Sequence, residues 1–152
     1  MALVNSSNAQ QALTYDGLHR HYIVKNRIDA SKTVAQGGVG TLLTTDTHKV
    51  LLLREGWLVQ RVWVRLVQKG TVGATTISKM GDSQNDAVWG INLFPIGTGG
   101  TVGNIEGGNS NGLLYDQDDW VLMTLATANF DGIIEIVAEI INVFGENTIL
   151  NV

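Results

Sequence analysis

Apolar and polar residues alternate with a period of two through most of the chain, which is the pattern of half-buried β-strands. Residues 57–69 show it most clearly, because apolar side chains would share one face there and arginine and tryptophan the other. The first face is predicted to hold Leu58, Val62, Val64 and Leu66, and the second Trp57, Arg61, Trp63 and Arg65. Val, Trp and alternating charge suit a long pleated strand.

Further strands are predicted where β-branched or alternating segments lie between turn signals. They cover residues 18–28, a short segment after the glycines at 37–40, and residues 49–53, 74–80, 87–94, 113–115, 120–128 and 133–143. Residues 133–144 could also be drawn as a helix, but the alternation and the preceding Asp131-Gly132, a strong hairpin signal, favour a strand. About eight strands without a clear helix predict an all-β protein, either a two-sheet sandwich or a barrel.

The domain organisation follows from length and from the start of the strand pattern. Residues 1–16 are polar and carry no clear strand or helix signal, so we expect an N-terminal arm there. Residues 17–152 are expected to form one antiparallel β-sandwich domain, since 152 residues suit a single core. No apolar run reaches the length of a membrane helix, and the first residues lack a signal-peptide pattern, so no membrane partner is expected.

Charge and composition narrow the classes of function. Charged residues make up 16% of the chain and the net charge is −4, whereas about 25% is usual for charged residues in soluble domains. The basic residues are dispersed, which argues against nucleic-acid binding. A surface with few charges is covered by uncharged polar residues or is buried against partner chains.

Three histidines are candidate metal ligands: His19 and His21, which would share one strand face, and His48. The alternative is a pair of solvent-facing residues, since zinc sites usually show more ligands at recognisable spacing. Glu135 and Glu139 would share a strand face and could form a carboxylate pair for glycoside hydrolysis, but their surroundings are predicted to be solvated. We expect no enzyme and no cofactor.

Two acidic clusters could supply oxygen ligands to calcium. They comprise Asp82, Asn85 and Asp86 in one segment and Asp116, Asp118 and Asp119 in another. Their spacing does not match the helix-loop-helix calcium signature, and Asp and Asn also form turns by bonding to the nearby backbone. The clusters are therefore either turn residues or a calcium site.

The tryptophan and arginine face of residues 57–69 is a candidate subunit or capsid interface, formed by Trp57, Arg61, Trp63 and Arg65. Trp and Arg are enriched at interface centres. The alternative is an ordinary exposed face on which arginine stacks over tryptophan. Trp89 and Trp120 are expected to be core or strand-end residues.

The order of features from residue 57 to residue 143 resembles that of phage capsid decoration (cement, or head-stabilising) proteins with a jelly-roll-like fold. The strand Trp57-Leu58-Val59-Gln60-Arg61-Val62-Trp63-Val64 is followed by a threonine-rich strand at 74–78, a Gly81-Asp82 turn and a glycine-rich loop. Leu113-Leu114-Tyr115-Asp116 then precedes Asp118-Asp119-Trp120-Val121-Leu122, and the Asp131-Gly132 hairpin leads into the last strand. The resemblance covers somewhat over half of the chain, and the residues before Trp57 match nothing.

The resemblance implies a non-enzymatic virion protein, made in the host cytoplasm and carried on the capsid surface. Its partners would be itself, as a homotrimer, and the major capsid protein, whose neighbouring capsomers it would clamp. The N-terminal arm would then contact the capsid. Tail-fibre tips share this architecture, so a receptor- or carbohydrate-binding module, with exposed tryptophan and calcium in the acidic loops, is the alternative. A glycoside-active or metal enzyme is the third.

Overall fold

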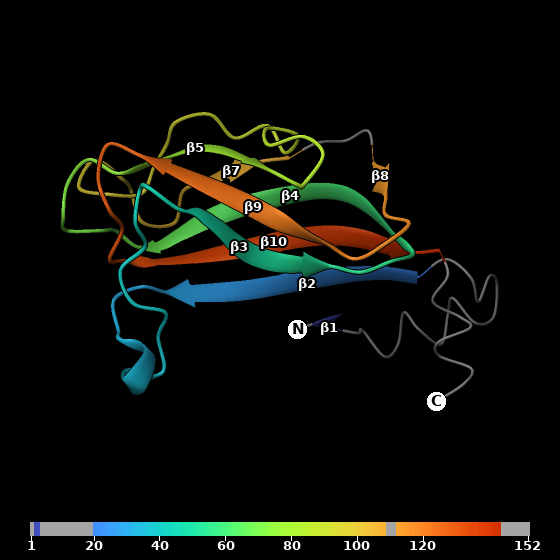
Figure 1. The fold of residues 1–152 in the computed structure, drawn as a ribbon, viewed down its shortest axis with the longest axis horizontal. Coiled ribbons are helices and arrows are strands. Elements are labelled where there is room, and N and C mark those ends of the chain that lie inside the picture. The colour runs from blue at the N-terminus through green and yellow to red at the C-terminus, as the bar shows by residue number, and fades with distance from the viewer. Residues whose placement is uncertain (1, 4–19, 109–111, 144–152) are drawn as a thin grey trace.

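The computed structural model describes residues 2–3, 20–108 and 112–143, and the regular secondary structure of these residues is almost entirely β (Figure 1). The strands are β1 (Ala2–Leu3), β2 (Arg20–Asp29), β3 (Thr47–Leu53), β4 (Trp57–Gln68), β5 (Thr76–Gly81), β6 (Phe94–Pro95), β7 (Ile105–Gly107), β8 (Leu113–Leu114), β9 (Asp119–Ala126) and β10 (Ile133–Asn142), with a single 3-10 turn, η1 (Val34–Gln36). Within the described residues, no helix is long and apolar enough to cross a membrane.

The strands form two antiparallel sheets that pack face to face, as the prediction of a sandwich required. One sheet has six strands in the order β1-β2-β10-β4-β7, with β8 also paired to β4, and the other has four in the order β3-β9-β5-β6. Pairs are nested along the chain, because β2 pairs with β10, β3 with β9, β4 with β7 and β8, and β5 with β6. This nested pairing over two sheets is the jelly-roll arrangement.

The core lies between the sheets and is built by alternate residues of the long strands. In β10 the buried positions are Ile133 at its start and then Ile134, Ile136, Ala138 and Ile140, and Glu135 and Glu139 between the latter face outward. The strand interpretation of residues 133–143 is thereby confirmed and the helical alternative is wrong. Full burial of a side chain such as Ile136 contributes roughly 1.5–3 kcal/mol. The strand is paired on both sides and forms the centre of its sheet.

One prediction about β4 is wrong because the strand contains a bulge. Glu139 lies opposite Arg61 while the next residue of β10, Ile140, lies opposite Val59, so Gln60 is an extra residue in β4. The extra residue reverses the alternation. Val59 is fully buried in place of Leu58, and Trp57 packs against the core instead of sharing the outer face of Trp63.

The segment 87–94 also differs from the prediction, because only Phe94 and Pro95 at its end pair as a strand. The preceding residues form turns that bring the fully buried Trp89 back over β5, where its backbone N–H donates to the carbonyl of Met80 at 3.0 Å. Trp89 is therefore a core residue, which is one of the two positions, core or strand end, that the sequence predicted for it. The glycine-rich stretch predicted as a loop contains β7, which pairs with β4.

The connecting loops gather at two ends of the sandwich. At the left of Figure 1, where β2, β4 and β9 finish, lie residues 30–46, 69–75, 96–104 and 127–132, which we call the loop end. Around the other end lie residues 82–93 and 115–118, which we call the acidic end. The loop after β2 is the longest, and it projects from the sandwich.

Candidate interaction surfaces

The outer face of the six-stranded sheet carries rows of opposite charges. Glu135 of β10 lies between Arg27 of β2 and Arg65 of β4 in the strand register. The Arg65 guanidinium is 3.3 Å from the Glu135 carboxylate, and that of Arg61 is 3.2 Å from the Glu139 carboxylate. Exposed pairs of this kind contribute about 0–1 kcal/mol each, so they neutralise Arg61 and Arg65 and add little to stability. The carboxylates proposed for glycoside chemistry are thus each paired with an arginine.

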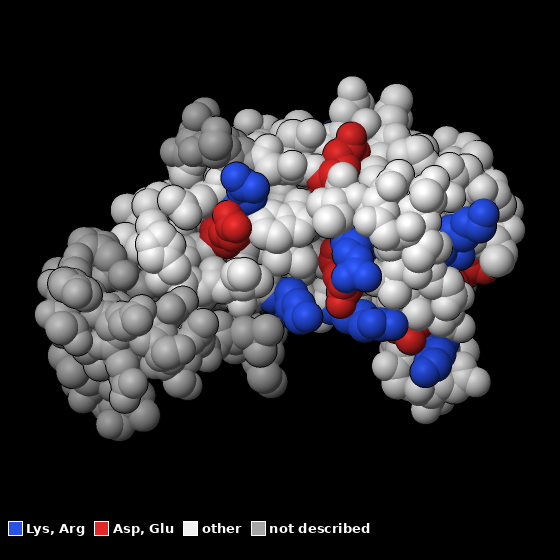
Figure 2. All heavy atoms as spheres, turned by 180° about the vertical axis from the view of Figure 1, so that it is seen from behind, with Lys and Arg blue, Asp and Glu red and all other residues white. Residues whose placement is uncertain are grey.

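Trp63 lies between these two charged rows, opposite Val137. Its ring centroid is 6.0 Å from the guanidinium carbon of Arg61, within cation–π range. Figure 2, which shows the molecule from behind, has acidic and basic side chains adjacent to one another near the middle of the face, with large uncharged areas around them. Arg61, Trp63 and Arg65 therefore remain together as a candidate interface.

Trp57 belongs to a different site. It lines a groove of about 430 Å³ together with Trp120 and Arg54, at the open edge between the two sheets where β2 faces β3. The Asn26 amide bridges that edge by donating to the Val50 carbonyl at 3.0 Å. The Lys49 ammonium lies over the Trp120 ring, 5.7 Å from its centroid. The bulge in β4 creates this pairing of tryptophans, and alternation alone could not predict it.

The two acidic segments meet at the acidic end, around the buried carboxylate of Asp82. One oxygen of Asp82 accepts hydrogen bonds from the backbone N–H groups of Gln84 and Asn85, both at 2.9 Å. The other oxygen accepts from the Tyr115 hydroxyl at 2.6 Å. Ser83 donates to Asp119 at 2.6 Å, which joins the segments a second time. Asp82 therefore acts as a turn residue that also ties the two segments together.

The other members of the acidic clusters are more exposed. The Asn85 side chain accepts from the Ala87 N–H at 3.1 Å, and Asp86 forms an ion pair with Lys79. Asp118 accepts from the Glu55 N–H at 2.9 Å, while Asp116 lines a cleft of about 530 Å³ beside Tyr115. In the described part of the chain, no three His, Cys, Asp or Glu side chains are grouped as a metal site would require. The calcium site thus stays a prediction, and the turn bonds are what the structure offers for these residues.

The candidate histidine ligands are not brought together. His21 lies on β2 in the six-stranded sheet, and His48 lies on β3 in the other, where its Nε2 is 2.8 Å from the Leu43 carbonyl oxygen. His19 lies outside the described residues.

One sequence pattern was missed: Gly108 to Gly112 reads Gly-Asn-Ser-Asn-Gly, which has the Gly-x-Ser-x-Gly spacing of the hydrolase nucleophile elbow. That elbow requires a strand before the serine and a helix after it. Here β7 precedes the segment and the strand β8 begins at Leu113. Residues 109–111 lie outside the described residues, and the flanking elements do not match the elbow.

Among the described residues, three groups have a shifted pKa, each with a local cause. Burial, reinforced by the hydrogen bond to Asp82, raises the pKa of Tyr115 far above its ordinary value. The hydrogen bond from the Thr71 side chain lowers the pKa of Asp131, and that from the Ser31 side chain lowers the pKa of Asp29. Burial and the hydrogen bonds that hold turns in place explain all three shifts, so these groups have structural roles.

Comparison with known proteins identifies a shared fold. No protein-family model and no curated protein sequence matches the chain. A chain of the capsid asymmetric unit of cyanophage Pam1 has the same fold with a TM-score of 0.57 and 15% identity, over 81% of this chain and 85% of that one. The chain shares its fold with a phage capsid component. A second chain, from the acid-stable capsid of Helicobacter pylori bacteriophage KHP30, gives a TM-score of 0.46 and 11% identity over 81% and 88% of the two chains.

Proposed function

We propose that this chain is a non-enzymatic structural protein of a phage virion, which decorates the capsid and stabilises it as a homotrimer that bridges neighbouring capsomers. The observation that carries the proposal is the match to the cyanophage Pam1 capsid chain. The match spans 81% of this chain and 85% of that one, so the two are similar in length and each is largely one sandwich. The sequence resemblance to decoration proteins supports the same function.

The surfaces of the molecule suit an assembly role. Charged residues are only 16% of the chain, and the most prominent carboxylates are engaged by arginines or by turn amides. The Arg61, Trp63 and Arg65 face is proposed as the contact between subunits of the trimer, because its residue types are those enriched at interface centres. Because Arg61 and Arg65 are already paired with Glu139 and Glu135, a neighbouring subunit can cover these two arginines without leaving them unmatched.

Two measurements test this proposal. Light scattering after size exclusion should give three times the mass of the chain, 16.4 kDa, and the protein should co-sediment with capsids that lack it. A monomer at high concentration that does not bind capsids would refute both the assembly and the function.

A receptor- or carbohydrate-binding module of a tail fibre is the second candidate, and the Trp57 and Trp120 groove favours it. At about 430 Å³ the groove is within the usual range of ligand sites, and it combines aromatic surfaces with the polar side chains of Arg54 and Asn26. A glycan array should then show binding that disappears with Trp120→Ala and persists with Trp63→Ala, which lies outside the groove. Binding lost only on addition of a chelator would point instead to the acidic end.

A further inference from the structure

The loop end carries most of the exposed large apolar side chains of the described chain. Nine such side chains are at least two-fifths exposed, and five lie in its loops: Val34 (76%), Val39 (46%), Leu43 (42%), Val72 (57%) and Val102 (58%). The other four are distributed over β2, β7, β8 and the segment before β6. Val34, Val39 and Leu43 lie on the loop after β2, and Val72 and Val102 lie on two other loops of the same end. Exposed apolar groups that form a patch mark interaction sites.

Hydrogen bonds between the loops hold this end in one shape. The side-chain oxygen of Asn129 accepts a hydrogen bond from the Thr44 N–H at 3.0 Å, and the backbone carbonyl of Asn129 accepts one from the Thr75 hydroxyl at 2.8 Å. The Thr98 N–H donates to the Gly73 carbonyl at 2.8 Å, which adds the fourth loop to the other three. A surface ordered in advance loses little conformational entropy when a partner binds.

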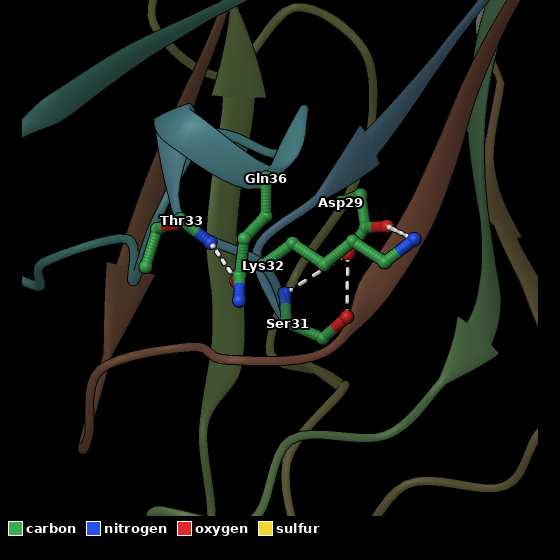
Figure 3. A network of polar contacts seen from close by, with 5 residues as sticks. All are labelled: Asp29, Ser31, Lys32, Thr33 and Gln36. Atoms are coloured by element: carbon green, nitrogen blue, oxygen red, sulfur yellow. Dashed lines mark hydrogen bonds and ion pairs between the residues drawn. The ribbon is translucent and has the colours of Figure 1, made fainter.

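The projecting loop after β2 is organised in the same way (Figure 3). The Asp29 side chain accepts from the Ser31 N–H at 3.0 Å, and the Asp29 carbonyl accepts from the Val39 N–H at 2.9 Å, which closes the base of the loop. The Gln36 side chain accepts from the Thr33 N–H at 3.1 Å and holds the 3-10 turn that carries Val34. The most exposed large apolar side chain of the described residues therefore stands on a fixed turn.

Charge indicates what kind of partner this end would fit. Its four loops contain four charged residues, Lys32, Asp46, Lys69 and Asp131. Asp131 is bonded to Thr71, and Lys32 lies 4.0 Å from Asp29. Phosphate-rich nucleic acid or anionic lipid would need a basic surface, which these loops do not provide. An uncharged, apolar protein surface is the complementary partner.

We propose that the loop end is the surface by which this protein docks onto the capsid shell, through an apolar patch of the major capsid protein that receives Val34 and Val72. The inference rests on the proposed function and specifies which part of the molecule serves it. It leaves the Arg61, Trp63 and Arg65 face for contacts between copies. Because the docking surface has few charges, shell binding is expected to depend little on salt.

The test compares two variants, one double and one single, that place aspartate at exposed apolar positions. Val34→Asp with Val72→Asp changes the loop end, whereas Leu93→Asp is the matched control, since Leu93 is 58% exposed elsewhere and its φ of 55° is one that aspartate tolerates. Co-sedimentation with capsids lacking the protein is measured at low and high salt. Light scattering and thermal melting verify assembly and folding.

We expect the double variant to bind capsids at least about tenfold more weakly, as loss of an interface anchor does, with assembly unchanged. Leu93→Asp should bind like the wild type, and wild-type binding should change less than about threefold with salt. A double variant that binds normally, an equal loss with Leu93→Asp, or loss of self-assembly by the double variant overturns the inference alone. Wild-type protein that fails to bind capsids overturns the proposed function as well. If the double variant does not fold, Val34→Ser with Val72→Ser removes the apolar groups without adding charge, and normal binding by it overturns the inference.

Discussion

The Tyr115 hydroxyl donates a hydrogen bond of 2.6 Å to the buried carboxylate of Asp82, 33 residues earlier in the chain. Asp82 is 5% exposed and Tyr115 is 7% exposed. Since the other oxygen of Asp82 caps the turn at Gln84 and Asn85, this contact links the turn after β5 to the segment before β9. The bond from Ser83 to Asp119 is the second link between them.

Tyr115→Phe should therefore destabilise the protein by about 1–3 kcal/mol at neutral pH, because it leaves a buried carboxylate oxygen without a donor. Urea unfolding followed by tryptophan fluorescence measures the change. The matched control is Tyr22→Phe, a half-buried tyrosine of β2, which is expected to have a smaller effect. Equal effects of the two substitutions would show that the Tyr115 bond contributes nothing specific.

The same bond predicts a loss of stability in alkali. The folded-state pKa of Tyr115 is raised above its unfolded value by burial and by Asp82, so its contribution is complete below about pH 10 and declines as the pH rises further. The free energy of unfolding, measured with urea between pH 8 and pH 11.5, should fall more steeply for the wild type than for Tyr115→Phe, by up to about 1.4 kcal/mol per pH unit. Parallel curves would contradict the assignment.

For Asp131 we predict a loss of stability at acid pH instead. Its folded-state pKa is lowered by hydrogen bonds from Thr71, so its contribution is present above the unfolded pKa of about 4 and is lost as the pH falls through the lower folded value. Asp131→Ala should reduce stability by about 1 kcal/mol at pH 7, and the difference from the wild type should shrink below pH 4. A difference that persists unchanged at pH 2.5 would mean that the side chain acts through something other than its charge.

Trp63→Ala should weaken self-association if the outer sheet face is the trimer contact. Trp63 is central between the Arg61–Glu139 and Arg65–Glu135 pairs, and loss of a central tryptophan commonly reduces affinity by more than tenfold. Light scattering across a concentration series measures this, with Trp120→Ala on the other sheet as the control. A trimer that survives Trp63→Ala but not Trp120→Ala would move the contact to the groove side.

The strands were predictable because they depend on local alternation. From Ile134 to Ile140 of β10 every second residue is buried and Glu135 and Glu139 point outward, as the period of two requires. The position of Trp57 was not predictable, because the extra residue Gln60 is recognised only from the register against β10. Side chains alternate on each side of a bulge, but the extra residue moves those beyond it to the opposite face of the sheet from the one that alternation predicts.

The sites were less predictable than the strands, since they arise from contacts between distant segments. Both acidic clusters were visible in the sequence, but their meeting through Tyr115 and Asp82 depends on the path of the chain between β5 and β9. The groove of Trp57 and Trp120 and the cross-bonded loop end likewise depend on how the two sheets are stacked. Side-chain composition identified the residue types, and only the fold shows which of them are neighbours.

Electron cryomicroscopy of virus particles made with and without the gene for this chain tests the central claim most directly. The account predicts trimeric density of two-sheet sandwiches on the outer surface of the capsid, in contact with it through the loop end, that is missing from particles without the gene. Identical capsids in the two samples, or density for the protein only on the tail, would contradict it.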